Sequence, residues 1–158
     1  MERLLTIETQ TMIKQGSKLY IGSDHAGFEL KEKIKSMLIE LGYSVEDVGT
    51  HDTSSCDYPD FAKPVAIAVS EGKAEAGILV CSTGIGMSMA ANKVHGVRAA
   101  LVHHAYEAKM TRQHNNANVL CLGANITGPA IALEAVKTFL NTDFEGGRHQ
   151  RRVDKIEQ

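Results

Sequence analysis

From residue 18 onward, short apolar runs alternate with longer segments in which apolar residues recur at helical spacing. Short apolar or alternating runs are typical of strands, whereas apolar residues three and four positions apart are typical of helices. The predicted strands cover residues 19–22, 43–48, 77–81, 98–102 and 118–123. The predicted helices cover residues 30–41, 61–70, 87–93, 106–114 and 129–140.

This alternation of strand and helix predicts an α/β domain with a parallel sheet and helices on both faces, because consecutive parallel strands need a crossover connection. In such sheets ligands gather beyond the carboxyl ends of the strands. Four segments lie at predicted carboxyl ends: Asp24-His25, the loop after Gly49, residues 81–86 and the turn after Gly123. We expect the functional site to be built from them.

The chain has 158 residues, which is enough for one domain with a hydrophobic core and too few for two ordinary domains. Residues 1–17 follow no clear period, and Gly16-Ser17 is a break signal. We therefore expect an N-terminal extension at 1–17, with Met12 as an alternative start, and a single domain at 18–158 that includes a basic tail. The first residues lack the features of a secretory signal, and no apolar run approaches the ~18 residues that span a bilayer.

The charge and cysteine content argue against some classes of partner and against a disulfide-bonded protein. Lysine and arginine total 17 and aspartate and glutamate total 19, so the formal charge is −2, without the broad basic field typical of nucleic-acid binders. The three cysteines, Cys56, Cys81 and Cys121, are an odd number, which argues against a disulfide framework and fits a reducing compartment. We expect a cytoplasmic protein that binds neither nucleic acid nor a membrane.

The strongest local signal is the segment Cys81-Ser82-Thr83-Gly84-Ile85-Gly86 between a buried strand and a helix. Its glycines allow a tight turn that presents several N–H groups in one direction, and the following helix adds the positive end of its dipole. This loop is predicted to hold an anion, and its field favours a thiolate at Cys81. The alternative is a small buried cysteine that simply ends a strand.

Known nucleotide-binding and phosphatase motifs do not fit this loop. A Walker A loop requires Gly-Lys-Ser/Thr, and no such lysine follows. A dinucleotide fingerprint requires a third glycine where Met89 stands, and a phosphatase-type cysteine loop requires an arginine where Met87 stands. The loop therefore indicates an anion site of another kind.

Several histidines are candidates for acid–base chemistry or phosphate binding. His25 follows Asp24 at the expected rim, where a carboxylate can hold sugar hydroxyls and an imidazole can transfer a proton or bind phosphate. His114 ends a predicted helix and is either an acid–base group or an ordinary surface histidine. The adjacent His103 and His104 point in different directions without an evident third ligand, so no metal site is expected.

A basic cluster near the C-terminus, Arg148, His149, Arg151 and Arg152, follows a pair of glycines. If this segment is helical, Arg148 and Arg152 share one face and can clamp a phosphate. The alternative is a solvated charge run. The glycine pair favours a bend that turns the cluster over a site.

Five segments together resemble the type B ribose-5-phosphate isomerase family, which includes the related galactose-6-phosphate and allose-6-phosphate isomerases. They are GSDHAGFELK at 22–31, DYP at 57–59, GILVCSTGIGMSMAANK at 77–93, RQHNNANV at 112–119 and EGGRHQRRV at 145–153. The resemblance implies a three-layer α/β/α domain with a Rossmann-like, five-stranded parallel sheet. It also implies homodimers, or dimers of dimers, whose active sites are shared between two subunits.

The resemblance assigns catalytic roles to Cys81, Thr83, His114 and Asp24. It implies that Cys81 is the base that moves a proton between C1 and C2 of the open-chain sugar phosphate, with Thr83 assisting at the substrate oxygens. His114 opens the furanose ring with Asp24 alongside.

The resemblance also implies a set of substrate-binding residues. Backbone amides of the loop hold the enediolate oxygen, two side chains contact the sugar, and basic side chains bind the phosphate. These residues are Ser82, Gly84, Ile85 and Gly86 for the enediolate, Asn115 and Tyr58 for the sugar, and His25, Arg148 and Arg152 for the phosphate, with His149 as a neighbour.

The expected reaction is the interconversion of D-ribose 5-phosphate and D-ribulose 5-phosphate in the non-oxidative pentose phosphate pathway, an intramolecular oxidoreduction without metal or organic cofactor. A six-carbon sugar phosphate is the first alternative, and a non-catalytic nucleotide- or phosphometabolite-binding module is the second. One departure bears on the substrate: Asn125 stands where many family members carry a phosphate-binding arginine. That role then falls to another basic residue, such as Arg112 or Arg151, or the phosphate site is weaker.

Overall fold

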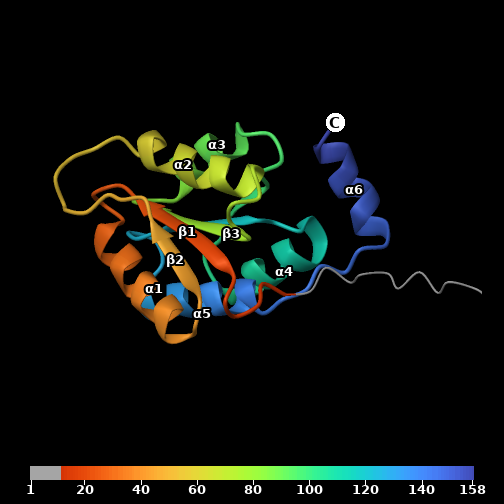
Figure 1. The fold of residues 1–158 in the computed structure, drawn as a ribbon, viewed down its shortest axis with the longest axis horizontal. Helices are drawn as coiled ribbons and strands as arrows, with labels where there is room; N and C mark the ends of the chain where they lie inside the picture. Colours follow the sequence, from red (N-terminus) through yellow and green to blue (C-terminus); the bar gives the residue numbers. More distant parts are fainter. Residues whose placement is uncertain (1–11) are drawn as a thin grey trace, which may run out of the picture.

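The computed structural model describes residues 12–158 of the chain, whose elements alternate between strand and helix until the last two helices (Figure 1). The strands are β1 (Lys18–Ser23), β2 (Ser44–Asp47), β3 (Ala76–Cys81), β4 (Ala99–Leu101) and β5 (Val119–Gly123). The helices are α1 (Phe28–Glu40), α2 (Pro59–Ser70), α3 (Ile85–Asn92), α4 (Ala105–Asn115), α5 (Pro129–Leu140) and α6 (Arg148–Ile156).

The five strands form one parallel sheet in the order β2-β1-β3-β5-β4. Helices α2 and α3 cover one face, and α1, α4 and α5 cover the other (Figure 1). The predicted three-layer α/β/α architecture is therefore confirmed. Strand β3 lies at the centre, so the loop that follows it emerges from the middle of the carboxyl edge.

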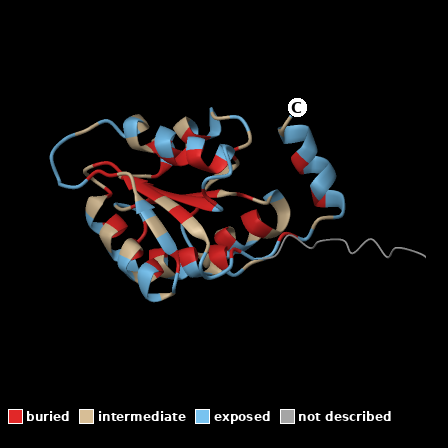
Figure 2. Cartoon of the chain, in the orientation of Figure 1, coloured by how far each residue is buried: buried red, intermediate tan, exposed pale blue. Residues whose placement is uncertain are grey.

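The sheet buries both of its faces, as its central strands show in Figure 2. Every residue of β3 and β5 is buried. Ile78 and Val80 belong to the core beneath α1 and α5, whereas Leu79 and Cys81 belong to the core beneath α2 and α3. This alternation follows the two-residue period of a strand. Cys81 thus ends the central strand on the α2–α3 side.

Several element boundaries differ from the sequence prediction by one or two residues, and two of them lie beside the candidate site. Helix α2 begins at Pro59 rather than at residue 61, so Pro64 lies inside the helix instead of near its start. Helix α3 begins at Ile85 rather than at residue 87. The residues that precede these helices are Tyr58 and Gly84, the latter in a left-handed conformation. Hydrophobic periodicity does not show which residue caps a helix, so the predicted starts are two residues late.

Ile13, which lies in the predicted N-terminal extension, packs on the core. Ile13 is 8 % exposed and belongs to the core, its N–H donates to the carbonyl of Leu140, and its own carbonyl accepts from the Tyr43 hydroxyl. The remainder of the predicted extension, residues 1–11, lies outside the described residues. Among residues 12–158, no helix combines the length and apolar character needed to cross a lipid bilayer.

Helix α6 stands apart from the three layers (Figure 1) and packs on α4. His149 and Val153 are its buried residues, and most of its remaining surface is exposed (Figure 2). Gly146 and Gly147, with φ of +67° and +55°, turn the chain into this helix. The bend expected from the glycine pair is therefore present, because glycine adopts positive φ without a steric penalty.

Candidate active site

The loop after β3 places one backbone donor on the sulfur of Cys81 and another on the Thr83 hydroxyl. The Gly84 N–H donates to Cys81 Sγ at 3.1 Å, and the Ile85 N–H donates to Thr83 Oγ1 at 3.3 Å. The first intrahelical bond of α3 runs from the Ser88 N–H to the Gly84 carbonyl, so the amides before it point outward from the helix N-terminus. Cys81 itself is 4 % exposed, so in a single chain only a small part of it reaches solvent.

Position 84 requires glycine for two reasons, its backbone conformation and the lack of space for a side chain. Its φ is +77°, and a Cβ at this position would lie 2.6 Å from Leu101 Cδ1 and 2.9 Å from the backbone carbon of Leu122. The loop therefore rests directly on the end of β5 and on the edge strand β4. No other residue type fits without moving the donors away from Cys81.

We expect Gly84→Ala to destabilise the protein by about 3 kcal/mol, because positive φ and a backbone clash combine at a site that cannot relax. Gly72 is a matched control: its φ is +74°, but a Cβ there meets nothing within 4 Å. Gly72→Ala should therefore cost only about 1–2 kcal/mol, the conformational penalty alone. Urea unfolding at one protein concentration measures both values, and equal losses would contradict the steric argument.

Asp24 and His25 lie beside this loop. Ser23 pairs with Val80 across the sheet, and the Asp24 N–H donates to the Val80 carbonyl. The Asp24 side chain is buried, and its Oδ1 accepts the N–H of Gly27 at the start of α1. Its carboxylate therefore stabilises the turn into α1, and its backbone lies beside the end of β3.

His25 is oriented by a residue that sequence reasoning did not assign to the site. The backbone N–H of Cys56 donates to His25 Nδ1 at 3.2 Å, and Cys56 Sγ lies 3.8 Å from the same nitrogen. Because Nδ1 accepts, a neutral imidazole carries its proton on Nε2. The loop after Gly49 thus fixes the orientation of the His25 ring through Nδ1. No local sequence signal predicts this contact between residues 31 positions apart.

A buried ion pair fixes the start of that loop. Asp47 Oδ2 accepts from Lys31 Nζ at 2.6 Å and from Lys35 Nζ at 3.1 Å, and Asp47 Oδ1 accepts the Gly49 N–H. Burial alone would raise the pKa of Asp47, but the hydrogen bonds from Lys31 and from the Gly49 amide hold it below its ordinary value. Lys31 is fully buried, which its sequence position does not suggest.

Tyr58 and Asn125 also lie beside the Cys81 loop. A Cβ on Gly86 would lie 2.6 Å from the Tyr58 ring, so the ring covers the start of α3 while remaining 40 % exposed. Asn125 Nδ2 donates to Ser82 Oγ at 2.8 Å. We call this set of residues the carboxyl-edge group: Asp24, His25, Cys56, Tyr58, Cys81 to Gly86, and Asn125.

The remaining predicted residues lie elsewhere, at the end of α4 and in α6, together with Glu145, which the sequence did not single out. We call these residues the amino-edge group: His114, Asn115, Glu145, Arg148, His149 and Arg152. His114 and Asn115 end helix α4. Arg148 and Arg152 lie in α6, which is helical as the phosphate-clamp hypothesis requires, and both are exposed. At i and i+4 their side chains share one face of the helix.

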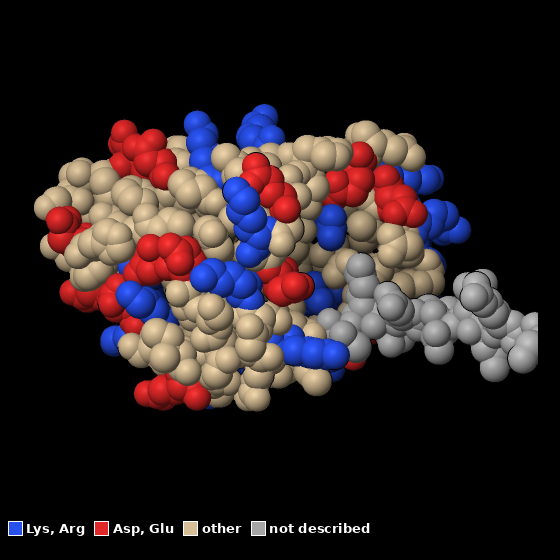
Figure 3. Space-filling view, in the orientation of Figure 1, with Lys and Arg blue, Asp and Glu red and all other residues tan. Residues whose placement is uncertain are grey.

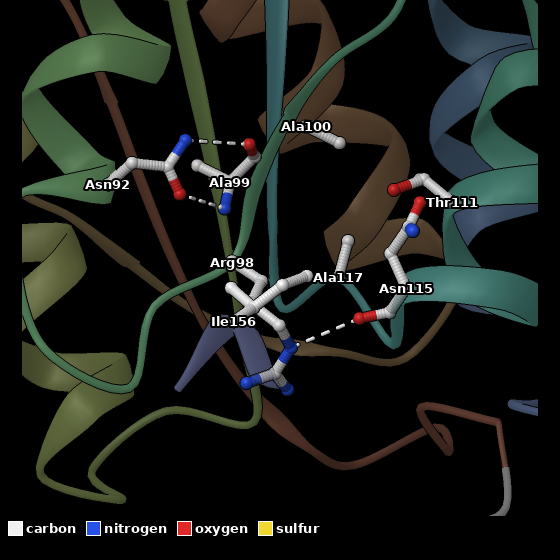
Figure 4. A pocket seen from close by; sticks show the side chains of 8 residues that line it. All are labelled: Asn92, Arg98, Ala99, Ala100, Thr111, Asn115, Ala117 and Ile156. Atoms are coloured by element: carbon white, nitrogen blue, oxygen red, sulfur yellow. Dashed lines mark hydrogen bonds between the residues drawn. The ribbon is translucent and has the colours of Figure 1, made fainter. Parts of the chain in front are cut away.

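Arg98 holds this region together. Its Nε donates to the Asn115 carbonyl at 3.0 Å, its Nη2 donates to the Asn116 carbonyl at 2.9 Å, and its Nη1 pairs with Glu157 at 2.7 Å. A pocket of about 300 Å³ lies beside it between β4, α4 and the end of α6 (Figure 4). Arg98 thus satisfies the last carbonyls of α4 and ties them to the C-terminal segment.

The two groups lie at opposite ends of the sheet. Arg98, which contacts the end of α4, immediately precedes β4, and β5 begins at Val119, a few residues after His114. Cys81 instead pairs with Gly123 at the far end of β5. A strand rises about 3.3 Å per residue, so the two ends of β5 are about 13 Å apart. Within one chain, His114 and Cys81 therefore do not meet.

Arg112 does not take over the phosphate role suggested by the missing arginine at position 125. It is buried, its Nη1 donates to Asn116 Oδ1 and to the Ala117 carbonyl, and its Nε donates to the Thr142 carbonyl. The guanidinium is thus used to hold the end of α4, and that suggestion is corrected. Arg151 is exposed on α6. The face shown in Figure 3 carries interspersed basic and acidic side chains.

Comparison with known proteins gives a consistent family. The family model described as Ribose/Galactose Isomerase matches residues 19–156. The ribose-5-phosphate isomerase B of Escherichia coli is 45 % identical over 139 residues, covering 88 % of this chain and 93 % of the relative. The structure of the Clostridium thermocellum ribose-5-phosphate isomerase B superposes with a TM-score of 0.88 at 51 % identity, covering 89 % and 95 % of the two chains.

A third match includes a ligand. The structure of the ribose-5-phosphate isomerase B from Mycoplasma genitalium, with bound ribulose-5-phosphate, superposes with a TM-score of 0.88 at 45 % identity. It covers 91 % of this chain and 96 % of the other. The likeness therefore extends over nearly the whole of both molecules.

Proposed function

Because the chain belongs to the ribose/galactose isomerase family, we propose that it interconverts D-ribose 5-phosphate and D-ribulose 5-phosphate, with Cys81 as the proton-transferring base. It is an isomerase. The observation that carries the proposal is the placement of Cys81 Sγ at the end of the central strand, within a loop whose Gly84 amide points at the sulfur. Among the family members, a structure with bound ribulose-5-phosphate supports the choice of substrate.

The proposed chemistry moves one proton between neighbouring carbons. The Cys81 thiolate removes the C2 proton of the open-chain aldose, the C2–H electrons form a C1=C2 double bond, and the carbonyl electrons move to O1. A proton passes from O2 to O1, assisted by the Thr83 hydroxyl. The Cys81 thiol then returns its proton to C1 as the O2 electrons form the new C2 carbonyl. C1 is reduced, C2 is oxidised, and no external electron acceptor is consumed.

The amides at the start of α3 supply the electrostatic part of the mechanism. Deprotonation next to a carbonyl is slow in water because the enediolate is unstable. Fixed N–H donors at a developing oxyanion contribute about 3–4 kcal/mol each by loss-of-donor measurements. The family resemblance assigns this role to the Ser82, Gly84, Ile85 and Gly86 amides. In the structure, the Gly84 and Ile85 N–H groups donate to Cys81 Sγ and Thr83 Oγ1. Glycine at 84 and 86 lets this backbone pack closely against Leu122 and the Tyr58 ring, which fixes the position of the donors.

The separation of the two groups supports a shared active site in a homodimer or a dimer of dimers. The carboxyl-edge group contains the base, and the amino-edge group contains the candidates for ring opening and phosphate binding, about 13 Å or more away. A second copy that brings its amino-edge group against the carboxyl-edge group of the first would complete the set. His114 then opens the furanose ring beside Asp24, Asn115 and Tyr58 bind the sugar, and Arg148, Arg152 and His25 bind the phosphate.

The surface of the chain is suited to such a contact. Met89 of α3 and Tyr106 of α4 are 65 % and 68 % exposed, and Ile156 of α6 is 60 % exposed. Exposed apolar residues beside an edge strand are typical of subunit contacts. The three free cysteines further favour a cytoplasmic setting, consistent with the non-oxidative pentose phosphate pathway.

Turnover of three aldose phosphates tests the substrate. We expect kcat/KM for ribose 5-phosphate to exceed that for allose 6-phosphate and for galactose 6-phosphate by about 10-fold or more, because one added carbon displaces either the phosphate or C1–C2. The ketose products can be followed directly by NMR. Faster turnover of a six-carbon phosphate would establish the first alternative. Nucleotide binding without any isomerisation would establish a non-catalytic module.

A further inference from the structure

The imidazole rings of His114 and His149 lie face to face. Their centroids are 4.4 Å apart, and the ring planes differ by 13°. His114 ends α4 and His149 belongs to the first turn of α6, so the stack joins the two helices of the amino-edge group. His149 is 7 % exposed, which is a much deeper burial than a phosphate-binding side chain on a solvated helix requires.

His149 is itself held by the segment that leads into α6. His149 Nε2 lies 3.3 Å from Oε2 of Glu145, which is four residues earlier in the segment before the helix. The Glu145 N–H donates to the carbonyl of Gln113, the residue before His114. The chain from 145 to 149 is therefore bound to the end of α4 at two points, by the Glu145 backbone and by the histidine stack.

We propose that His149 is a positioning residue for His114: its ring, oriented by Glu145, holds the His114 imidazole in the single plane needed for proton transfer during ring opening. This inference rests on the proposed role of His114. A stacked neighbour restricts ring rotation, and a misplacement of about 1 Å in a catalytic group can cost 10²-fold in rate.

The electrostatic surroundings favour a neutral His149. Burial is the main cause that lowers its pKa; the neighbouring His114, Arg148 and Arg152 add repulsion, and Glu145 opposes them. A neutral ring can remain stacked on His114 while His114 gains and loses a proton. A charged ring would repel the protonated form of His114.

A metal site is the other reading of these side chains. Ligand atoms of His114, Glu145 and His149 lie within 4.8 Å of one another. Imidazole nitrogens bind a metal through lone pairs that lie in the ring plane. Two nearly parallel, stacked rings keep these lone pairs in separate planes that do not meet at one ion. The stack therefore favours positioning over chelation.

Two assays on the same protein separate ring opening from proton transfer. Turnover of ribose 5-phosphate, which is mainly cyclic, requires both steps. Ribulose 5-phosphate cannot form a furanose through its phosphorylated C5 oxygen, so deuterium uptake at its C1 in D₂O reports the Cys81 step alone. We expect His114→Ala to abolish turnover but retain this exchange.

We expect His149→Ala to lower turnover of ribose 5-phosphate by about 10- to 100-fold while C1 exchange stays within about twofold of the wild-type rate. His149→Phe keeps a flat ring without a ligand nitrogen and should restore most of the turnover. His103 is the matched control, because it pairs with Glu107 at the same i, i+4 spacing outside both groups; His103→Ala should change neither assay.

Three results would overturn the proposal. Unchanged turnover in His149→Ala would show that the stack has no role in ring opening. Equal losses of turnover and exchange would show that His149 only anchors α6 and its arginines. A His149→Phe variant as poor as His149→Ala would show that a ring nitrogen of His149, rather than its stacked plane, is what turnover requires. Failure of the proposed function looks different: the wild type would show no C1 exchange, or His114→Ala would turn over normally.

Discussion

Replacing Cys81 by alanine is expected to lower kcat for ribose 5-phosphate by about 10²–10⁴-fold, the usual contribution of a positioned general base. The amide donors of the loop remain in place, so substrate binding should change far less than kcat. Cys81→Ser should be nearly as poor, because a hydroxyl is a much weaker acid than a thiol and supplies almost no anionic base at neutral pH. Steady-state kinetics on both variants provide the measurement.

Cys121 offers a matched control. It lies on β5, paired with Leu79 on the same face of the sheet as Cys81, and is fully buried. Burial raises the pKa of its thiol far above the ordinary value, so it is not a candidate base. Cys121→Ala should retain kcat and lose stability by about 1 kcal/mol through a small cavity. Near wild-type turnover in Cys81→Ala would exclude Cys81 as the proton carrier.

Mixing two inactive variants is expected to restore activity if the site is shared between subunits. A dimer of one Cys81→Ala chain and one His114→Ala chain has one site with both defects and one site with neither. Random assembly of equal amounts makes half of the dimers mixed, so about a quarter of all sites should be intact. The two chains can be co-expressed with different affinity tags, and kcat per site, compared with the wild type, then measures the fraction of intact sites.

The matched control for this experiment combines Cys81→Ala with Cys81→Ser. Both defects lie in the carboxyl-edge group, so no combination of chains contains an intact site and no activity should return. Recovery of activity in this control would indicate contamination with wild-type enzyme. Absence of recovery in the His114 mixture, with mixed dimers demonstrated by their tags, would mean that each site is formed within one chain.

Much of the architecture follows from local chemistry. The apolar runs that became β1, β3 and β5 have the length and composition of buried strands, and α5 spans Pro129–Leu140 as predicted. The Cys81 loop could also be recognised, because glycines between a buried strand and a helix have few structural uses. These features depend on neighbours in the sequence, so periodicity and turn chemistry suffice to predict them.

Several element boundaries, and contacts between residues far apart in the chain, could not be predicted from the sequence. The Cys56 amide on His25 and the Arg98 link to Glu157 join residues 31 and 59 positions apart. Neither leaves a periodic signal, since any residue has an amide and an arginine can serve many purposes. The suggestion that Arg112 binds phosphate failed for the same reason: sequence does not show that its guanidinium is enclosed by carbonyls at the end of α4.

The sequence by itself therefore determined the family, the alternating elements, the parallel sheet and the identity of the reactive loop, because each is encoded in short stretches of chain. Only the tertiary structure decided where the pieces lie. The order β2-β1-β3-β5-β4 sets Cys81 in the middle of the sheet, and the parallel strand direction sets it at the carboxyl end. Helix α4 runs back and returns His114 to the other end. That separation and the stack of His114 on His149 arise from how whole elements pack, which no local pattern records.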